Sequence, residues 1–242
     1  MSAARRRRPA LASTRGRTTP AGARGTPSRP RGDPNPAGAH ALADRIAAAL
    51  VAAAGIGPDD LVLDIGAGMG AVTRPLARTG ARVIAVERDA WIAQRLSRRM
   101  EPWPNVTVLT GDALLVPLPG RPYRVVANLP FAITTALLRR LVDTRIVAAD
   151  LVVEIGAGRR LSGMPDRPEL VRWHRRFTIT LGRRIPATSF RPAPPVDGVV
   201  LQLRRRSARS GRANVSVPPA GARTRGYRVS GSRTRRSGRA GR

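Results

Sequence analysis

The 242-residue chain contains no lysine and no cysteine, so all 44 of its basic side chains are arginine. The lack of cysteine excludes disulfides, thiolate metal ligands and thiol catalysis, and it is typical of cytoplasmic proteins. No apolar run reaches the ~20 residues that a membrane-spanning helix needs, and no apolar stretch follows the N-terminal arginines as in a secretory signal. We therefore expect a cytoplasmic protein with no membrane partner and no metal site.

Acidic residues are missing from both ends of the chain. Residues 1–32 hold nine arginines and residues 204–242 hold thirteen, without a single acid, whereas residues 33–203 hold 22 arginines against 15 acids. Such ends bury too little apolar surface to fold, so we expect a disordered basic arm (1–32) and a disordered tail (204–242) around one folded domain (33–203). Their natural partner is a polyanion such as RNA. A GC-rich genome would also favour arginine over lysine, but it would not remove the acids.

Apolar segments of strand length alternate with helical patterns through the middle of the chain. Helices are expected at residues 39–54, 71–78, 91–100 and 134–142, and strands at residues 61–65, 82–87, 105–109, 123–127 and 149–154. This alternation predicts an α/β, Rossmann-like fold with a mostly parallel, doubly wound sheet. Two later strands, at 177–181 and 199–203, have no long helix between them and predict a C-terminal antiparallel hairpin.

A glycine-rich turn, Asp64-Ile-Gly66-Ala-Gly68-Met-Gly70, follows the first of these strands. Glycines here let the backbone and the amides of the next helix approach a ligand closely. The spacing matches neither the dinucleotide fingerprint nor the P-loop. Asp64 would repel a phosphate but would bind an ammonium group, which favours S-adenosylmethionine over NAD or ATP. A partial echo, residues 154–158, lacks the third glycine, and chance is favoured over a second cofactor loop.

Acidic residues also follow the next two strands. Glu87 ends the second strand, where a carboxylate accepts hydrogen bonds from ribose hydroxyls. Asp112 follows the third strand, where a carboxylate would accept from an adenine amino group. Each acid alone is more often a cap or a loop residue. Together with Asp64 they predict a cofactor site at the edge of the sheet where the strands end.

The fourth strand ends in Asn128-Leu129-Pro130-Phe131. An ordinary turn is the simpler interpretation, but the residues also suit a planar amine. The Asn128 side-chain oxygen and the Leu129 carbonyl would accept the two hydrogens of an adenine amine and direct its lone pair at a methyl donor. Pro130 would fix the turn, and Phe131 would stack on the base for about 1–3 kcal/mol. Such a base must first leave its stack.

With these residues, the chain resembles the rRNA adenine N6-methyltransferases, most closely the erythromycin-resistance branch that acts on 23S rRNA, in a shortened form without the helical C-terminal domain. The resemblance is carried by the glycine turn, residues 87–89 and 111–112, residues 128–131, and Phe190-Arg-Pro-Ala-Pro-Pro-Val-Asp197. It implies a class I methyltransferase fold and S-adenosylmethionine as cofactor. The resemblance assigns cofactor or target contacts to Gly66, Gly68, Gly70, Glu87, Asp112 and Asn128.

Residues 39–42 stand where this family usually has Gln-Asn-Phe-Leu. The resemblance therefore assigns His40 and Leu42 to the methionine end of the cofactor, with a helix cap as the alternative for His40. It further implies a monomer that methylates an adenine of 23S rRNA, free or in a ribosomal particle, with macrolide-type resistance as the outcome.

Three other functions remain open. The first is dimethylation of 16S rRNA in ribosome assembly, against which the missing helical domain counts. The second is a non-catalytic RNA-binding factor with the same fold, which would not need residues 128–131 intact. The third is a small-molecule methyltransferase, which the arginine-rich ends disfavour.

Overall fold

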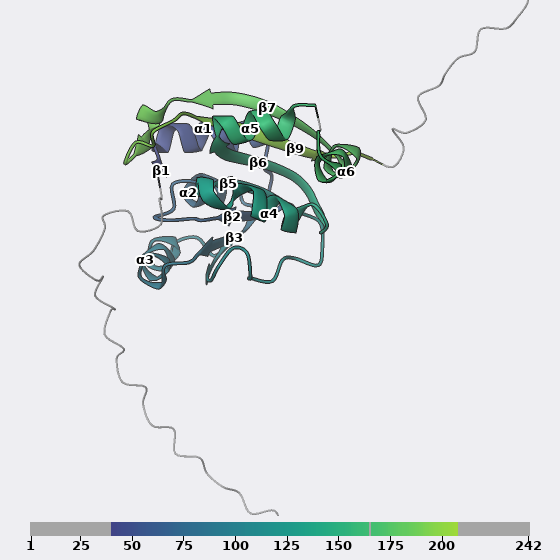
Figure 1. The fold of residues 1–242 in the computed structure, drawn as a ribbon. Helices are drawn as coiled ribbons and strands as arrows, with labels where there is room; N and C mark the ends of the chain where they lie inside the picture. Colours follow the sequence, from purple (N-terminus) through teal and green to yellow (C-terminus); the bar gives the residue numbers. More distant parts are fainter. Residues whose placement is uncertain (1–39, 165, 208–242) are drawn as a thin grey trace, which may run out of the picture. The chain divides into compact units, whose positions relative to one another are not determined.

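The computed structural model describes residues 40–164 and 166–207 (Figure 1). The predicted basic arm, 1–32, and nearly all of the predicted tail, 204–242, lie outside these residues. The described part contains a seven-stranded sheet in the order β4-β3-β2-β5-β6-β9-β7. The strands of this sheet are β2 (Leu61–Ile65), β3 (Arg82–Glu87), β4 (Val106–Thr110), β5 (Tyr123–Asn128), β6 (Ile146–Glu154), β7 (Phe177–Ile185) and β9 (Gly198–Arg205).

Strands β2 to β6 pair in parallel, and β9 pairs antiparallel with both β6 and β7. The predicted mostly parallel α/β sheet and its antiparallel C-terminal pair are therefore confirmed. The helices are α1 (Asp44–Ala54), α2 (Thr73–Ala77), α3 (Ala90–Met100), α4 (Thr134–Leu141), α5 (Ile155–Ser162) and α6 (Pro168–Arg176), with 3-10 turns η1 (Phe131–Ile133) and η2 (Ala187–Ser189). Within the described residues, no helix has the length and apolar character needed to cross a membrane.

Both faces of the central strands are covered, because alternate residues pack into two different apolar clusters. Leu63, Val125 and Leu151 join a cluster with α4, α5 and α6. Val62 and Val126 face the other way and join a cluster with α1 and α2. Burial on both sides explains why these strands are continuously apolar in the sequence.

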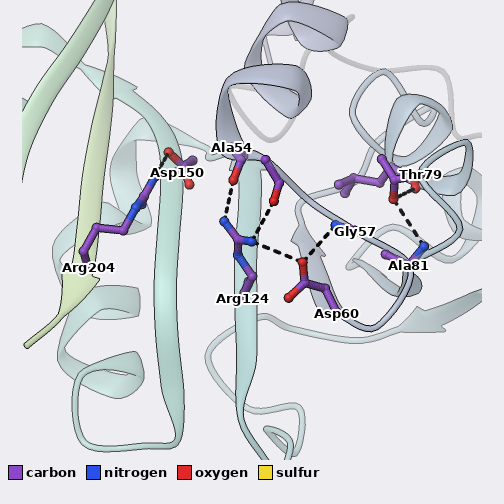
Figure 2. A network of polar contacts seen from close by, with 10 residues as sticks. Ala54, Gly57, Asp60, Thr79, Ala81, Arg124, Asp150 and Arg204 are labelled. Atoms are coloured by element: carbon purple, nitrogen blue, oxygen red, sulfur yellow. Dashed lines mark hydrogen bonds and ion pairs between the residues drawn. The ribbon is translucent and has the colours of Figure 1, made fainter. Parts of the chain in front are cut away.

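Arg124 of β5 ties the end of α1 to the start of β2 (Figure 2). Its guanidinium donates to the carbonyls of Ala54 and Gly55 and to Asp60, whose Oδ2 also accepts from the Gly57 N–H at 3.0 Å. The carbonyls at the end of a helix lack partners within the helix, and the arginine satisfies two of them. Helix α1 is thus fixed against the middle of the sheet.

The structure corrects the predicted start of the first helix, which begins at Asp44 and not at residue 39. Residues 41–42 instead form strand β1 (Ala41–Leu42), which pairs antiparallel with β8 (Phe190–Arg191). The Ala43 N–H donates to the Ser189 carbonyl at 2.9 Å, which prolongs this pairing. Alanine-rich sequence favours a helix, but a distant strand partner overrides the local preference here.

Three further differences concern the second half of the chain. Helix α6 was not predicted; its only buried side chains are Leu170 and Trp173. The last strand continues into the predicted tail, because Arg204 pairs with the buried Asp150 (Figure 2) and Arg205 donates to two backbone carbonyls. The partial echo of the glycine turn forms α5, in which a Cβ on Gly158 would lie 2.5 Å from Val199. This glycine serves helix packing and not a second cofactor loop.

Candidate functional site

The predicted site residues converge on one edge of the sheet. Strands β2, β3, β4 and β5 are parallel, so their carboxyl ends lie at the same edge. The chain proceeds from β2 outward through β3 to β4, and then returns to the other side of β2 as β5. Ligands of open α/β sheets bind where the strand order reverses in this way. Here that point lies between the glycine turn and Asn128.

The glycine turn packs directly against the segment 128–131. Gly66 has φ of 71°, and a Cβ at this position would lie 3.1 Å from Pro130 Cδ. Gly70 has φ of 89°, and its Cβ would lie 2.7 Å from Leu96 of α3. Both glycines therefore combine a left-handed backbone with a close approach to a neighbouring side chain, which would have to shift to admit a Cβ. The two segments singled out in the sequence form one site.

Asp64 lies inside the protein, in the last turn-facing part of β2. Its side chain is almost completely buried and accepts a hydrogen bond from Thr73 Oγ1 at 2.6 Å. Burial raises the pKa of this carboxyl group to about 7, against the opposing effect of the Thr73 hydrogen bond. In this structure Asp64 joins the end of β2 to the start of α2, and its contact with a ligand's ammonium group stays a prediction.

Because the carboxyl group of Asp64 is buried, we expect the difference in stability between wild type and Asp64→Asn to depend on pH. Because burial raises the pKa of Asp64, the folded state keeps its proton between about pH 4 and pH 7 while the unfolded state loses it, so this residue destabilises the fold as pH rises. Asparagine cannot ionise. Relative to wild type, the free energy of unfolding of Asp64→Asn should therefore increase by about 2–3 kcal/mol from about pH 5 to about pH 8. Urea unfolding of both proteins across this range measures the difference, and a constant difference would contradict the prediction.

Glu87 and Asp112 lie beside the glycine turn. The Gly68 N–H donates to Glu87 Oε2, and the Asp89 N–H donates to Glu87 Oε1, each at 2.9 Å. Next to it, the Gly111 N–H donates to the Glu87 carbonyl, and Asp112 Oδ1 accepts from the Leu114 N–H at 2.8 Å. The structure therefore brings together the glycine turn and the two strand-end acids, as predicted, and shows that each acid also holds its own loop.

Asn128 presents a hydrogen-bond acceptor without a partner. Its Nδ2 donates to the His40 carbonyl at 2.7 Å, and its Oδ1 is buried and accepts no hydrogen bond from the described residues. A carbonyl can only accept, so the nitrogen of the amide must face His40 and the oxygen must face away. Leaving such an acceptor buried and unpaired costs about 1–3 kcal/mol. The site thus holds an oriented acceptor ready for a donor.

His40, whose carbonyl accepts from this amide, belongs to a row of three rings. The rings of His40 and Phe131 lie 6.0 Å apart, and Phe190 meets Phe131 edge to face at 6.3 Å. His40 Nδ1 lies 2.8 Å from the Pro192 carbonyl and must therefore carry the proton. His40 is not a helix cap, because Ala43 occupies the N-cap of α1. Sequence reasoning did not assign Phe190 and Pro192 to the site, although the Phe-Arg-Pro motif was the available signal.

The side chains of two other predicted site residues are buried. Leu42 is 3% exposed and packs in the apolar cluster beneath α1, and its contact with a cofactor stays a prediction. The side chain of Leu129 is also buried, and its N–H donates to the Val152 carbonyl at 3.1 Å. The carbonyls of Pro130 and Phe131 accept from Ile133 and Thr134, which begins the turn into α4. A ligand would therefore meet the backbone of Leu129.

The chain is similar to a known family and to curated proteins whose names refer to rRNA methylation or antibiotic resistance. The family described as ribosomal RNA adenine dimethylase matches residues 40–217. The chain is 37% identical to an rRNA adenine N-6-methyltransferase of Corynebacterium diphtheriae, over 60% of this chain and 57% of the relative. It is 40% identical to the mycinamicin-resistance protein MyrB of Micromonospora griseorubida, over 61% and 47%. It is 33% identical to ribosomal RNA small subunit methyltransferase A of Thermotoga neapolitana, over 68% and 65%.

The chain thus spans about half to two thirds of the length of these curated relatives. Among solved structures, it is similar to the 23S rRNA methyltransferase ErmE, with a TM-score of 0.65 and 29% identity over 69% of this chain and 70% of the other. A dimethyladenosine transferase from Plasmodium falciparum gives a TM-score of 0.62 and 25% identity, over 69% and 64%.

Proposed function

The chain belongs to the ribosomal RNA adenine dimethylase family, and from this membership we propose that it transfers a methyl group from S-adenosylmethionine to the N6 amine of an adenine in 23S rRNA. The observation that supports this most directly is the buried, unpaired Oδ1 of Asn128. An amine hydrogen is the donor that this acceptor lacks. A protein that only binds RNA would gain nothing from holding an unsatisfied amide at the ligand edge of its sheet.

The residues of the site fit both substrates. The three glycines of the turn add no side chains at the sheet edge, and the carboxylate of Glu87 at this turn suits the ribose hydroxyls of the cofactor. Asp112, beside Glu87, would accept from the adenine amino group of the cofactor. The cofactor supplies an activated methyl group on a sulfonium. On the other side of Pro130, Phe131 offers its ring to the target base.

Asn128 and Leu129 act on the target amine. The exocyclic nitrogen of adenine shares its lone pair with the ring, which makes it a poor nucleophile. When Asn128 Oδ1 and the Leu129 carbonyl accept the two amine hydrogens, the nitrogen is drawn toward tetrahedral geometry. Its lone pair is then exposed. The acceptor is already oriented by His40 before the base arrives, so little reorganisation is needed during the reaction. In the transfer, the nitrogen would form its bond to the methyl carbon while the bond from that carbon to the sulfonium sulfur breaks; the donor would leave as a neutral thioether, and one amine proton would leave to solvent.

The choice of 23S rRNA rests on the resistance branch of the family. MyrB is named as a mycinamicin-resistance protein, and ErmE is named as a 23S rRNA methyltransferase. Macrolide-type resistance is then the expected outcome of methylation by this chain. We further propose that it works as a monomer in the cytoplasm, on free rRNA or on a ribosomal particle, with the arginine-rich ends attracting the RNA. The second candidate is 16S rRNA, favoured by the similarity to small subunit methyltransferase A.

Radiolabelled S-adenosylmethionine tests the proposal. The full chain is incubated separately with purified 16S and 23S rRNA, beside an Asn128→Ala variant. Label is expected in 23S rRNA only and should be lost with the variant. Label in 16S rRNA only would favour the second candidate. Equal labelling by the variant and the wild type would refute the role given to Asn128.

A further inference from the structure

A basic cavity of about 320 Å³ lies between α4, α5 and the start of α6. Three arginines from three different elements line it, Arg139 of α4, Arg160 of α5 and Arg167 before α6, together with Thr135 and a single acid, Glu169. This cavity is separate from the glycine turn and from the Asn128 amide. None of the site residues predicted from the sequence lines it.

Both carboxylate oxygens of Glu169, the acid that lines the cavity, accept hydrogen bonds from Arg139. Arg139 Nε donates to Glu169 Oε1 at 2.7 Å, and Arg139 Nη2 donates to Oε2 at 3.1 Å. These hydrogen bonds hold the pKa of Glu169 below its usual range, so the group is a carboxylate at neutral pH. In the described part of the chain, neither Arg160 nor Arg167 forms an ion pair with an acid. The cavity therefore holds three cations against one anion.

The geometry suits a phosphodiester group. A guanidinium fork binds a carboxylate and a phosphate in the same two-point manner. Thr135 adds a hydroxyl, and two arginines without acidic partners add positive charge. Helix α4 begins directly after the turn at Phe131, with Thr135 in its first turn and Arg139 one turn later. The lining of the cavity thus begins at Thr135, four residues along the chain from the Phe131 ring that is proposed to hold the target base.

We propose that this cavity docks a backbone phosphate of the substrate RNA, and that Glu169 occupies the anion position in the free protein and releases Arg139 to that phosphate on docking. The inference rests on the proposed function, because it takes RNA as the substrate. Because Glu169 competes with the phosphate for Arg139, every RNA binds less tightly. An RNA whose phosphate is poorly aligned with the cavity loses the most affinity. The folded domain gains selectivity in this way, although the arginine-rich ends attract any polyanion.

The exchange has a measurable ionic signature. When a phosphate replaces Glu169, counterions leave the RNA, but the freed carboxylate attracts cations in turn. In Glu169→Gln no carboxylate is freed, so the variant should bind 23S rRNA roughly 3- to 10-fold more tightly at ~100 mM salt, and its plot of log Kd against log salt should be steeper by about one unit. Filter binding of the full chain without cofactor, from ~50 to ~200 mM salt, measures both quantities.

Two further variants separate this exchange from a general charge effect. Asp44→Asn also removes one negative charge and breaks an ion pair, with Arg74, but it lies on α1 at the opposite face of the sheet. It should leave the salt slope unchanged. Arg139→Gln combined with Glu169→Gln should abolish the gain in affinity. An equal gain in Asp44→Asn, a gain that persists without Arg139, or weaker binding by Glu169→Gln would each overturn the proposal.

Methylation is measured on the same preparations, so that failure of the phosphate-docking proposal can be distinguished from failure of the proposed methyltransferase function. Normal labelling of 23S rRNA with no specific effect of Glu169→Gln would reject the phosphate site and leave the proposed function intact. An affinity gain that depends on Arg139, without methylation of any rRNA, would reject the proposed function and leave an RNA-docking cavity.

Discussion

Replacing Asn128 with alanine is expected to lower kcat for methyl transfer by about 100- to 1000-fold, the range seen when one preorganised polar group of an active site is removed. The alanine cannot accept a hydrogen from the target amine, so the nitrogen lone pair stays conjugated with the ring. Binding of S-adenosylmethionine and of RNA should change far less than kcat. Single-turnover kinetics with labelled cofactor, together with direct titration of the cofactor, separate the two quantities.

Asn105→Ala is the matched control for this variant. Its Nδ2 also bridges backbone groups, the carbonyls of Ala77 and Ala81 at 2.8 and 2.9 Å, but it lies at the opposite end of β4 from the site. Its loss should reduce stability by about 1–3 kcal/mol and leave kcat near the wild-type value. Asn128→Asp adds a sharper test, because it keeps an acceptor but replaces the donor to the His40 carbonyl. A low kcat in Asn128→Asp is expected, and near-normal activity would show that the amide orientation is unimportant.

Gly66→Ala should weaken binding of S-adenosylmethionine by about 10- to 100-fold, or 1.4–2.8 kcal/mol. Two costs combine at this position. A left-handed backbone costs a residue with a Cβ about 1–2 kcal/mol, and the new methyl group would press on Pro130 at 3.1 Å. Relief of this contact moves the glycine turn away from residues 128–131, so the cofactor surface and the base pocket are both distorted. Calorimetric titration of the variant with cofactor measures the loss.

Gly55→Ala is the control that has the cost of a left-handed backbone without the contact on Pro130 that Gly66→Ala creates. Gly55 has φ of 60° at the end of α1, and a Cβ there would meet nothing within 4 Å. Both variants should lose stability in urea unfolding because of the backbone cost, Gly66→Ala more than Gly55→Ala, whereas only Gly66→Ala should lose cofactor affinity. If the two variants bind cofactor equally well, the packing of the glycine turn on Pro130 has no functional importance.

The central sheet could be predicted because its signals are local. Strand β2 was predicted with its observed bounds, since a short apolar run between turn residues is buried on both faces. The order of the strand ends then placed Glu87, Asp112 and Asn128 at one edge. Their contacts with cofactor and target stay predictions.

Features that depend on distant partners could not be predicted in the same way. Strand β1 exists because of β8, and the orientation of Asn128 depends on the carbonyl of His40. Asp64 has the sequence position of a ligand contact, but Thr73 and the surrounding core hold it inside. Helix α6 holds three arginines in nine residues and buries only two side chains, so its sequence contains few apolar residues that would indicate a helix.

The pairing of β1 with β8 has a consequence for the timing of activity during synthesis. The Asn128 amide is oriented by residue 40, and residue 40 is held in turn by residues 190–192. A nascent chain that has emerged only as far as α6 has the glycine turn and residues 128–131 but lacks the strand that fixes His40. The ribosome must therefore complete nearly the whole domain before the Asn128 amide takes the orientation that the finished fold gives it.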